Sequence, residues 1–269
     1  MADEGFAGKI GRFVPRYFFA LGCSLYLFTI GAFKNRLLIY QICEHFGWKQ
    51  PTWVERPPEE LPEVSVESVT AGEAPVMILP TRTSGNVSLL ETVVLNKVVK
   101  QAKPERLFEI GTFDGRTTLH FAANSPESAH VYTLDLPPDS SSSTKWEVCA
   151  NEKRYIGVKE PDRRFRGTPY ESKITQVYGD SATFAFTPYH GNIDLIFVDG
   201  SHAYEYAVSD SKAAMQMIRK GGTIFWHDYG EWDGVTKALN ELRVKDPRFK
   251  DLKRVEGTTL AFLTIPRSA

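Results

Sequence analysis

Two apolar segments late in the chain are each followed directly by side chains that can bind a metal ion or move a proton. The segments 192–198 and 223–226 lead into Asp199, His202, His227 and Asp228. Parallel strands present their carboxyl ends at one edge of a sheet, so we expect these four side chains to meet there. Buried carboxylates and histidines must pair with one another or coordinate a cation. The sequence therefore predicts a reactive cluster at this edge.

The cluster suits either metal binding or proton transfer. Asp199 and Asp228 with substrate oxygens suit magnesium or calcium, and a histidine ligand would move the preference towards manganese, iron or zinc. A histidine also titrates in the range useful for taking a proton from a hydroxyl. We expect His202 to be the base and His227 to join the two aspartates as a metal ligand. For both histidines, a purely hydrogen-bonded structural role remains the alternative.

A glycine-bounded loop earlier in the chain is the second candidate site. The apolar run 107–110 predicts a buried strand that breaks at Gly111 and enters a helix near residue 116. Gly111 and Gly115 flank the loop and would let its backbone approach a ligand closely. Glu109 and Asp114 make this turn acidic, which repels phosphate and favours a cationic ligand. A plain strand-to-helix turn is the alternative.

Two further strand ends add polar groups to the same edge. Residues 129–136 predict a strand that ends at Asp135, roughly 20 residues after the glycine loop, as expected for an acid that binds ribose hydroxyls. Residues 174–179 predict another strand, followed by Asp180 and Ser181. Either acid could instead cap the element that follows it.

The segment Glu109-Ile-Gly-Thr-Phe-Asp-Gly115 resembles motif I of the class I S-adenosylmethionine-dependent methyltransferases, and the resemblance covers about residues 86–262. It implies an α/β, Rossmann-like fold, with a seven-stranded, mostly parallel sheet, helices on both faces and an antiparallel last strand. It implies that Asp180 and Ser181 contact the adenine. The implied cofactor-binding residues are Glu109, Gly111, Thr112, Phe113, Gly115, Asp135, Leu136, Asp180, Ser181 and Asp199.

The later pair of strands resembles the metal-dependent O-methyltransferases, of which catechol O-methyltransferase is a member. In that group, acids at these two strand ends hold magnesium beside the substrate hydroxyls, and Asp199 and Asp228 match them. His202 stands where the catechol enzymes carry a lysine base, and Tyr229 stands where they carry an asparagine ligand. Asp-Gly-x-His and His-Asp at these ends are more similar to methyltransferases that tailor sugars and natural products.

The resemblance implies methyl transfer from S-adenosylmethionine to a hydroxyl oxygen of a small molecule, a sugar or natural product, assisted by Mg²⁺ or another divalent metal. His202 and Asp199 are the expected catalytic residues, and Asp199, Asp228 and His227 the expected metal ligands. Two alternatives stay open. One is a metal-dependent hydrolase or oxygenase that uses the Asp/His cluster, and the other is a cofactor-binding subunit without activity.

Residues 1–50 predict a helical, hydrophobic extension. Residues 17–33 carry no charge and lie between Arg16 and Lys34. As a helix they would span about 25 Å, short of the roughly 30 Å hydrocarbon core. Three interpretations stay open: membrane association, a helix packed on the domain or on a second copy in a homo-oligomer, and a cleaved signal peptide.

Residues 51–83, rich in proline and glutamate, predict a connector, and residues 84–269 predict the methyltransferase domain. Within the domain, the long polar stretch 137–174 predicts a lid or substrate loop. Its basic residues, among them Arg163, Arg164 and Arg166, would pair with an acidic substrate or lie in a solvated loop.

Composition narrows the class of partner. The 269 residues carry a formal net charge of -1 and no long basic run, so nucleic acid is not expected as a partner. Cys23, Cys43 and Cys149 form neither a disulfide framework nor a zinc motif. They favour a reducing, cytoplasmic location.

Overall fold

The computed structural model describes residues 6–35, 38–39, 42, 56–72, 74–78, 85–137, 144–148, 152, 155–156 and 162–267. The chain divides into two compact units, Met1–Arg56 and Pro57–Ala269. Most of residues 36–50 of the predicted helical extension lie outside the described residues, as do Cys43 and Cys149.

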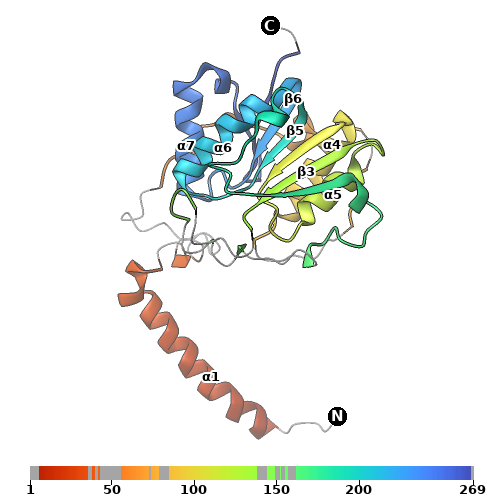
Figure 1. Ribbon diagram of the computed structural model, residues 1–269. Coiled ribbons are helices and arrows are strands. Elements are labelled where there is room, and N and C mark those ends of the chain that lie inside the picture. The colour runs from red at the N-terminus through yellow and green to blue at the C-terminus, as the bar shows by residue number, and fades with distance from the viewer. Residues whose placement is uncertain are drawn as a thin grey trace. The chain divides into compact units, whose positions relative to one another are not determined.

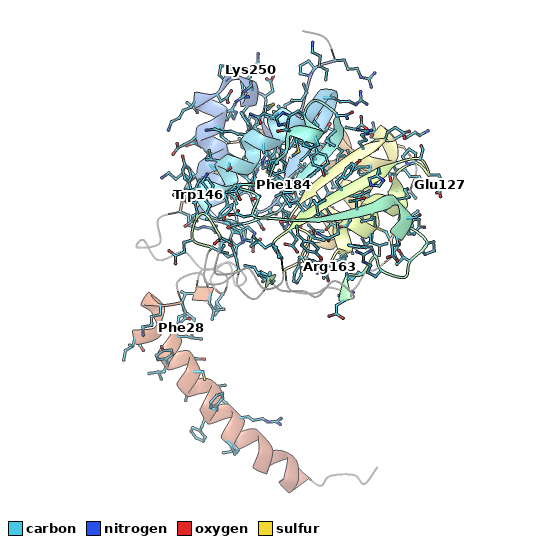
Figure 2. The ribbon with its side chains drawn as sticks, viewed as in Figure 1. Phe28, Glu127, Trp146, Arg163, Phe184 and Lys250 are labelled. Atoms are coloured by element: carbon cyan, nitrogen blue, oxygen red, sulfur yellow. The ribbon has the colours of Figure 1, made fainter. Side chains whose placement is uncertain are left out.

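The N-terminal unit contains the helix α1 (Phe6–Leu27), with Pro15 inside it, and the 3₁₀ turn η1 (Ile30–Phe33). Large apolar side chains stand out along α1 and beyond it, with Phe28 labelled in Figure 2. The exposed ones include Tyr17, Phe18, Phe19, Leu21, Leu25, Tyr26, Phe28 and Ile30. Among the described residues, no helix combines the length and apolar character needed to cross a membrane.

The second unit is built on one eight-stranded sheet (Figure 1). In spatial order its strands are β1 (Glu63–Val64), β7 (Lys253–Val255), β8 (Ala261–Thr264), β6 (Ile218–Trp226), β5 (Ile193–Val198), β2 (Arg106–Ile110), β3 (His130–Asp135) and β4 (Ile174–Tyr178). The expected α/β fold is confirmed, and β8 runs antiparallel to both of its neighbours. The sheet has one strand more than expected, because β1 pairs with β7 at the edge.

Helices cover both faces of the sheet, as Figure 1 shows. They are α3 (Val66–Val69), α4 (Leu89–Ala102), α5 (Arg116–Asn124), α6 (Tyr204–Met217) and α7 (Asp233–Lys245), with the 3₁₀ turns η4 (Glu171–Lys173), η5 (Thr187–Tyr189) and η6 (Pro247–Phe249). One hydrophobic cluster contains side chains of α6 and α7, and the other contains side chains of α4 and α5. Along β5, Ile196 belongs to the first cluster and Phe197 to the second, as the two-residue period of a strand requires.

The order of the strands positions the site. From β2 the chain continues to β3 on one side, and β5 pairs with β2 on the other side. Such a reversal of strand order opens a crevice beyond the carboxyl ends of the strands. All of the site segments predicted from the sequence follow β2, β3, β4, β5 or β6, so they reach this edge.

Candidate functional site

The glycine loop lies directly against the end of β5. Gly111 has a φ of 97°, and a Cβ built on it would lie 1.9 Å from the carbonyl oxygen of Asp199. Gly115 has a φ of 79°, and a Cβ there would lie 2.6 Å from the ring of Phe165. Both positions therefore require glycine, and the loop links the predicted cofactor site to the predicted metal site.

Glu109 is held inside the chain. It is buried, and its carboxylate accepts hydrogen bonds from Thr118 and, at 2.7 Å, from Thr133. Burial raises the pKa of Glu109 to about 8, with Asp199 and Asp135 acting in the same direction. The carboxyl group is therefore mainly protonated at neutral pH.

Asp135, the predicted ribose acid, ends β3 and is paired with an arginine. Its carboxylate lies 2.7 Å from Nη2 of Arg163 and accepts a hydrogen bond from the backbone N–H of Leu136 at 3.0 Å. Burial raises the pKa of Asp135, and the pair with Arg163 opposes that shift. Asp135 is thus partly exposed, oriented by its neighbours, and placed beside the glycine loop.

The basic residues of the 137–174 segment bind the chain's own acids. Besides the Arg163 pair, Arg164 pairs with Asp114 of the glycine loop, and Arg166 pairs with Glu171. The acidity of the loop had suggested that Asp114 faces a cationic ligand. Its carboxylate is instead paired with Arg164. Most of residues 138–161 lie outside the described part of the chain.

The turn after β4 contains the predicted adenine contacts. The carboxylate of Asp180 accepts hydrogen bonds from the backbone N–H groups of Lys145, at 2.7 Å, and Ala182, at 3.0 Å. This is the capping role that the sequence left open, and it holds residue 145 of the predicted lid segment next to the turn. Nearby, Asp210 of α6 is fully buried, and burial raises its pKa to about 7.

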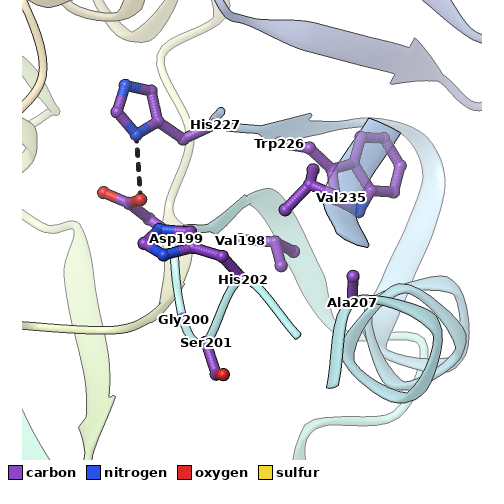
Figure 3. A pocket seen from close by; sticks show the side chains of 9 residues that line it. All are labelled: Val198, Asp199, Gly200, Ser201, His202, Ala207, Trp226, His227 and Val235. Atoms are coloured by element: carbon purple, nitrogen blue, oxygen red, sulfur yellow. Dashed lines mark hydrogen bonds and ion pairs between the residues drawn. The ribbon is translucent and has the colours of Figure 1, made fainter. Parts of the chain in front are cut away.

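Asp199, His202 and Asp228 come together at the ends of β5 and β6. Each offers one potential ligand atom, and these atoms all lie within 4.8 Å of one another. Asp199, His202 and His227 also line a small pocket beside Gly200 and Trp226 (Figure 3). The structure thus brings these side chains together at one edge of the sheet, as the sequence predicted.

His202 lies between two carboxylates. Its Nε2 is 2.6 Å from Asp228 and its Nδ1 is 2.5 Å from Glu152, while its ring stacks on Trp232 with centroids 4.3 Å apart. Burial lowers the pKa of His202, but Asp228 and Glu152 outweigh it and raise the pKa to about 10. The ring is therefore protonated at neutral pH while both carboxylates face it.

His227, expected to be a metal ligand, is held by three acids. Its Nδ1 lies 3.0 Å from Asp199 and 3.3 Å from Asp228, and its Nε2 lies 3.4 Å from Glu91. Burial lowers the pKa of His227, but Asp228 and Asp199 outweigh it and raise the pKa well above its usual value. His202, rather than His227, completes the close group of three.

Two acids of the cluster, Glu91 and Glu152, were missed from the sequence. Both are buried. Glu91 gives a sequence signal only as the third helical residue after Ser88, a capping box that the structure contains. That signal says nothing of His227. Glu152 stands in a stretch without periodicity and gave no signal.

The cluster fits a cation. Four carboxylates surround two imidazole rings, which leaves an excess of two negative charges when both rings are protonated. When the His202 ring is neutral, two aspartates and one imidazole nitrogen are a donor set that divalent metals accept. Asp228 also has a φ of 66°, a strained conformation of the kind found at functional sites.

Tyr229 faces away from this cluster. Its hydroxyl accepts hydrogen bonds from the backbone N–H groups of Glu60, at 2.7 Å, and Leu61, at 2.9 Å, and donates to Asn240 at 2.8 Å. The residue is 2% exposed. The position that supplies an asparagine ligand in the catechol pattern therefore supplies a core residue here.

Comparisons with known proteins find similarity to methyltransferases. Residues 108–229 match a family model described as a methyltransferase domain. The chain is 25% identical over 160 residues to catechol O-methyltransferase B of Danio rerio, which covers 59% of this chain and 54% of the relative. It is 27% identical over 158 residues to caffeoyl-CoA O-methyltransferase of Stellaria longipes, which covers 57% of each.

The chain thus spans about half the length of the curated relatives that it matches. Among solved structures, the O-methyltransferase TomG from Streptomyces achromogenes, in complex with SAM, has a TM-score of 0.49 at 15% identity. That match covers 67% of this chain and 81% of TomG.

Residues 108–229 thus match a methyltransferase domain, and the chain is similar to two O-methyltransferases. The resemblance to the class I S-adenosylmethionine-dependent methyltransferases seen in motif I is confirmed.

Proposed function

We propose that this protein transfers a methyl group from S-adenosylmethionine to a hydroxyl oxygen of a small molecule. The observation that carries the proposal is the contact between the two sites. The glycine loop touches Asp199 at Gly111, and Asp199 in turn belongs to the close group with His202 and Asp228. A cofactor on the loop and an acceptor at the cluster would therefore meet.

The cofactor supplies, when bound, an activated methyl group on a cationic sulfur. We propose that Gly111, Thr112, Phe113 and Gly115 shape its site, that Asp135 accepts its ribose hydroxyls, and that the turn at Asp180 and Ser181 borders its adenine. Glu109 would support the loop from beneath, through its bonds to threonine hydroxyls.

Asp199 and Asp228 would hold a divalent cation, with His202 in reach of the same ion. A divalent cation bound there would lower the pKa of a substrate hydroxyl that it coordinates. His227, held by Glu91, would keep both aspartates in place rather than bind the ion.

His202 is the proposed proton acceptor. Both ring nitrogens carry protons at neutral pH while Asp228 and Glu152 face them. A divalent cation that engages Asp228 would remove this carboxylate from Nε2, and Nε2 would then lose its proton and be free to take the proton of the acceptor hydroxyl. The acceptor oxygen then forms a bond to the methyl carbon as the carbon–sulfur bond breaks, and the electron pair of that bond stays on sulfur. In-line alignment of the oxygen and sulfur is the main requirement.

Calorimetric titration of S-adenosylhomocysteine into the full-length protein, with and without Mg²⁺ or Mn²⁺, tests this function. We expect micromolar binding that tightens with metal in the wild type, and no tightening in Asp199→Asn. Absence of binding under every condition would remove the cofactor assignment and favour a metal-dependent hydrolase or oxygenase. Binding without turnover of any hydroxyl acceptor would favour a non-catalytic subunit.

The role of His202 has its own test. His202→Ala should slow methyl transfer by about 100-fold or more, as loss of a general base does. Affinity for S-adenosylhomocysteine should stay within about two-fold, because the ring lies outside the glycine loop. A loss of metal affinity in the same variant would instead make His202 a ligand.

We also propose that the N-terminal unit attaches a cytoplasmic protein to a membrane surface. Its apolar side chains are exposed along α1, and Arg16 and Lys34 lie at the two ends of the uncharged stretch. Apolar surface flanked by cations suits the interface of an anionic bilayer. Assembly of two copies through α1 is the competing arrangement, which light scattering would detect.

A further inference from the structure

Arg163 is a buried cation with unused donors. Its side chain is 1% exposed, and Nη2 lies 2.7 Å from the Asp135 carboxylate. Nε and Nη1 are also buried, and neither has a hydrogen-bond partner among the residues that the structure describes. A guanidinium group carries only donors, so these two N–H groups require an acceptor that the described chain does not provide. Buried donors without partners are rare and unfavourable.

The backbone holds Arg163 at the glycine loop. The next residue, Arg164, donates its backbone N–H to the carbonyl oxygen of Asp114 at 2.8 Å, and its side chain pairs with the same residue. Phe165 is fully buried, close to Gly115. Figure 2 labels Arg163 at the loop-lined edge of the sheet. The guanidinium is therefore fixed beside both the glycine loop and the end of β3.

The pair of Arg163 and Asp135 suits a neutral hydroxyl better than an anion. The Asp135 carboxylate already balances the guanidinium charge, so an incoming anion would meet as much repulsion as attraction. A hydroxyl is both a donor and an acceptor. It can give its proton to Asp135 and accept a hydrogen bond from Nε or Nη1 of Arg163.

We propose that Arg163 and Asp135 together bind the ribose diol of the cofactor, with Asp135 as acceptor and Arg163 as donor. This inference rests on the proposed function, because it requires a nucleoside cofactor on the glycine loop. It makes Arg163 a cofactor-binding residue, and it makes the segment around Arg163 one wall of the cofactor site.

The test compares Arg163→Lys with Arg166→Lys. Lysine keeps a cation that can pair with Asp135 but lacks the guanidinium fork. Arg166 lies on the same segment, pairs with Glu171 at 2.9 Å and is partly exposed, so it is the matched control. Each full-length variant is titrated with S-adenosylhomocysteine and with its 2′,3′-dideoxyribose analogue.

We expect Arg163→Lys to bind S-adenosylhomocysteine about 10-fold or more weakly than the wild type, as loss of charge-assisted hydrogen bonds does. The dideoxy analogue should bind Arg163→Lys and the wild type equally, and Arg166→Lys should match the wild type with both ligands. The test compares the affinities of two ligands for the same variant. A change in folding stability would weaken both to the same extent and would leave their ratio unchanged.

Three results would overturn the inference. Unchanged binding by Arg163→Lys would show that the ligand does not use the guanidinium donors. Tighter binding would show that Arg163 blocks the access of the ligand to Asp135. An equal loss for both ligands would make the residue a support of the fold. Failure of the wild type to bind S-adenosylhomocysteine would instead overturn the proposed function itself.

Discussion

Asp210 shows at the residue scale how a buried acid makes stability depend on pH. Its carboxyl is fully buried, and burial raises its pKa from 3.8 to about 7. Because the folded-state pKa lies above the unfolded-state value, the folded chain binds more protons between these two pH values. Stability from this group is therefore lost as the pH rises through that window.

Asp210→Asn should remove this dependence. We expect the variant to gain stability relative to the wild type as the pH rises from 5 to 8, by an amount on the order of a few kcal/mol. Urea unfolding followed by tryptophan fluorescence at the two pH values measures it. A difference between variant and wild type that is the same at both pH values would contradict the prediction.

Asp246→Asn is the matched control for that measurement. Arg248 pairs with Asp246 at 2.6 Å and lowers its pKa. The stability from this pair is present above the unfolded-state pKa and is lost only as the pH falls through the lower folded-state value. The effect of Asp246→Asn should therefore be flat between pH 5 and 8.

The sequence predicted the members of the reactive cluster but not the partners that set their chemistry. Asp199 and Asp228 follow apolar strands, and the parallel arrangement of those strands brings them together. Glu152 and Glu91 are 50 and 136 residues away along the chain from the histidines that they bind. No local period or spacing encodes such contacts, so the protonation of His202 could not be predicted.

At the scale of elements, the ends of the strands could be predicted from the periodicity of the sequence. The contact between the glycine loop after β2 and the residues after β5 could not. A glycine between a strand and a helix predicts a turn. That the turn at Gly111 touches the carbonyl oxygen of Asp199 depends on β2 and β5 being neighbours. Arg163 and Arg164 were likewise predicted to face a substrate or solvent, because their partners Asp135 and Asp114 lie at or beyond the ends of other strands and become neighbours only in the fold.

Gly111→Ala tests the contact between these two loops. The new Cβ would combine a positive φ with a steric overlap on backbone, and neither can relax independently. We expect a loss of roughly 2–5 kcal/mol in the free energy of unfolding, and loss of S-adenosylhomocysteine binding. Urea unfolding and calorimetry provide the two measurements.

Gly191→Ala separates strain from overlap. Gly191 also has a positive φ, 63°, but a Cβ there would meet nothing within 4 Å. Its substitution should cost only about 1–2 kcal/mol and leave ligand binding unchanged. An effect of Gly111→Ala no larger than that of Gly191→Ala would mean that the loops separate readily.

At the scale of the whole molecule, Tyr229 ties the start of the second unit to its C-terminal half. Tyr229→Phe would leave two backbone N–H groups, those of Glu60 and Leu61, and the Asn240 side chain without their partner. We expect a loss of about 1–3 kcal/mol, with faster hydrogen exchange at residues 60 and 61. Hydrogen exchange in β4 serves as the internal reference. Unchanged exchange at residues 60 and 61 would show that the Tyr229 hydroxyl does not stabilise this segment.

The division at residue 57 separates the proposed chemistry from the proposed attachment. Both hydrophobic clusters of the sheet, and every residue of the candidate site, lie within Pro57–Ala269. A chain of residues 57–269 should therefore fold and bind S-adenosylhomocysteine within about two-fold of the full chain, because it keeps its core and all of its site.

The same deletion tests what the exposed apolar residues of α1 do. Full-length protein should sediment with vesicles that contain anionic lipid, less so at high salt, and residues 57–269 should remain in the supernatant. Phe18→Glu with Phe19→Glu in the full chain should reproduce the loss of sedimentation without changing ligand affinity, since both side chains are exposed in the N-terminal unit. Vesicle binding that survives both changes would place the attachment surface on the methyltransferase domain instead.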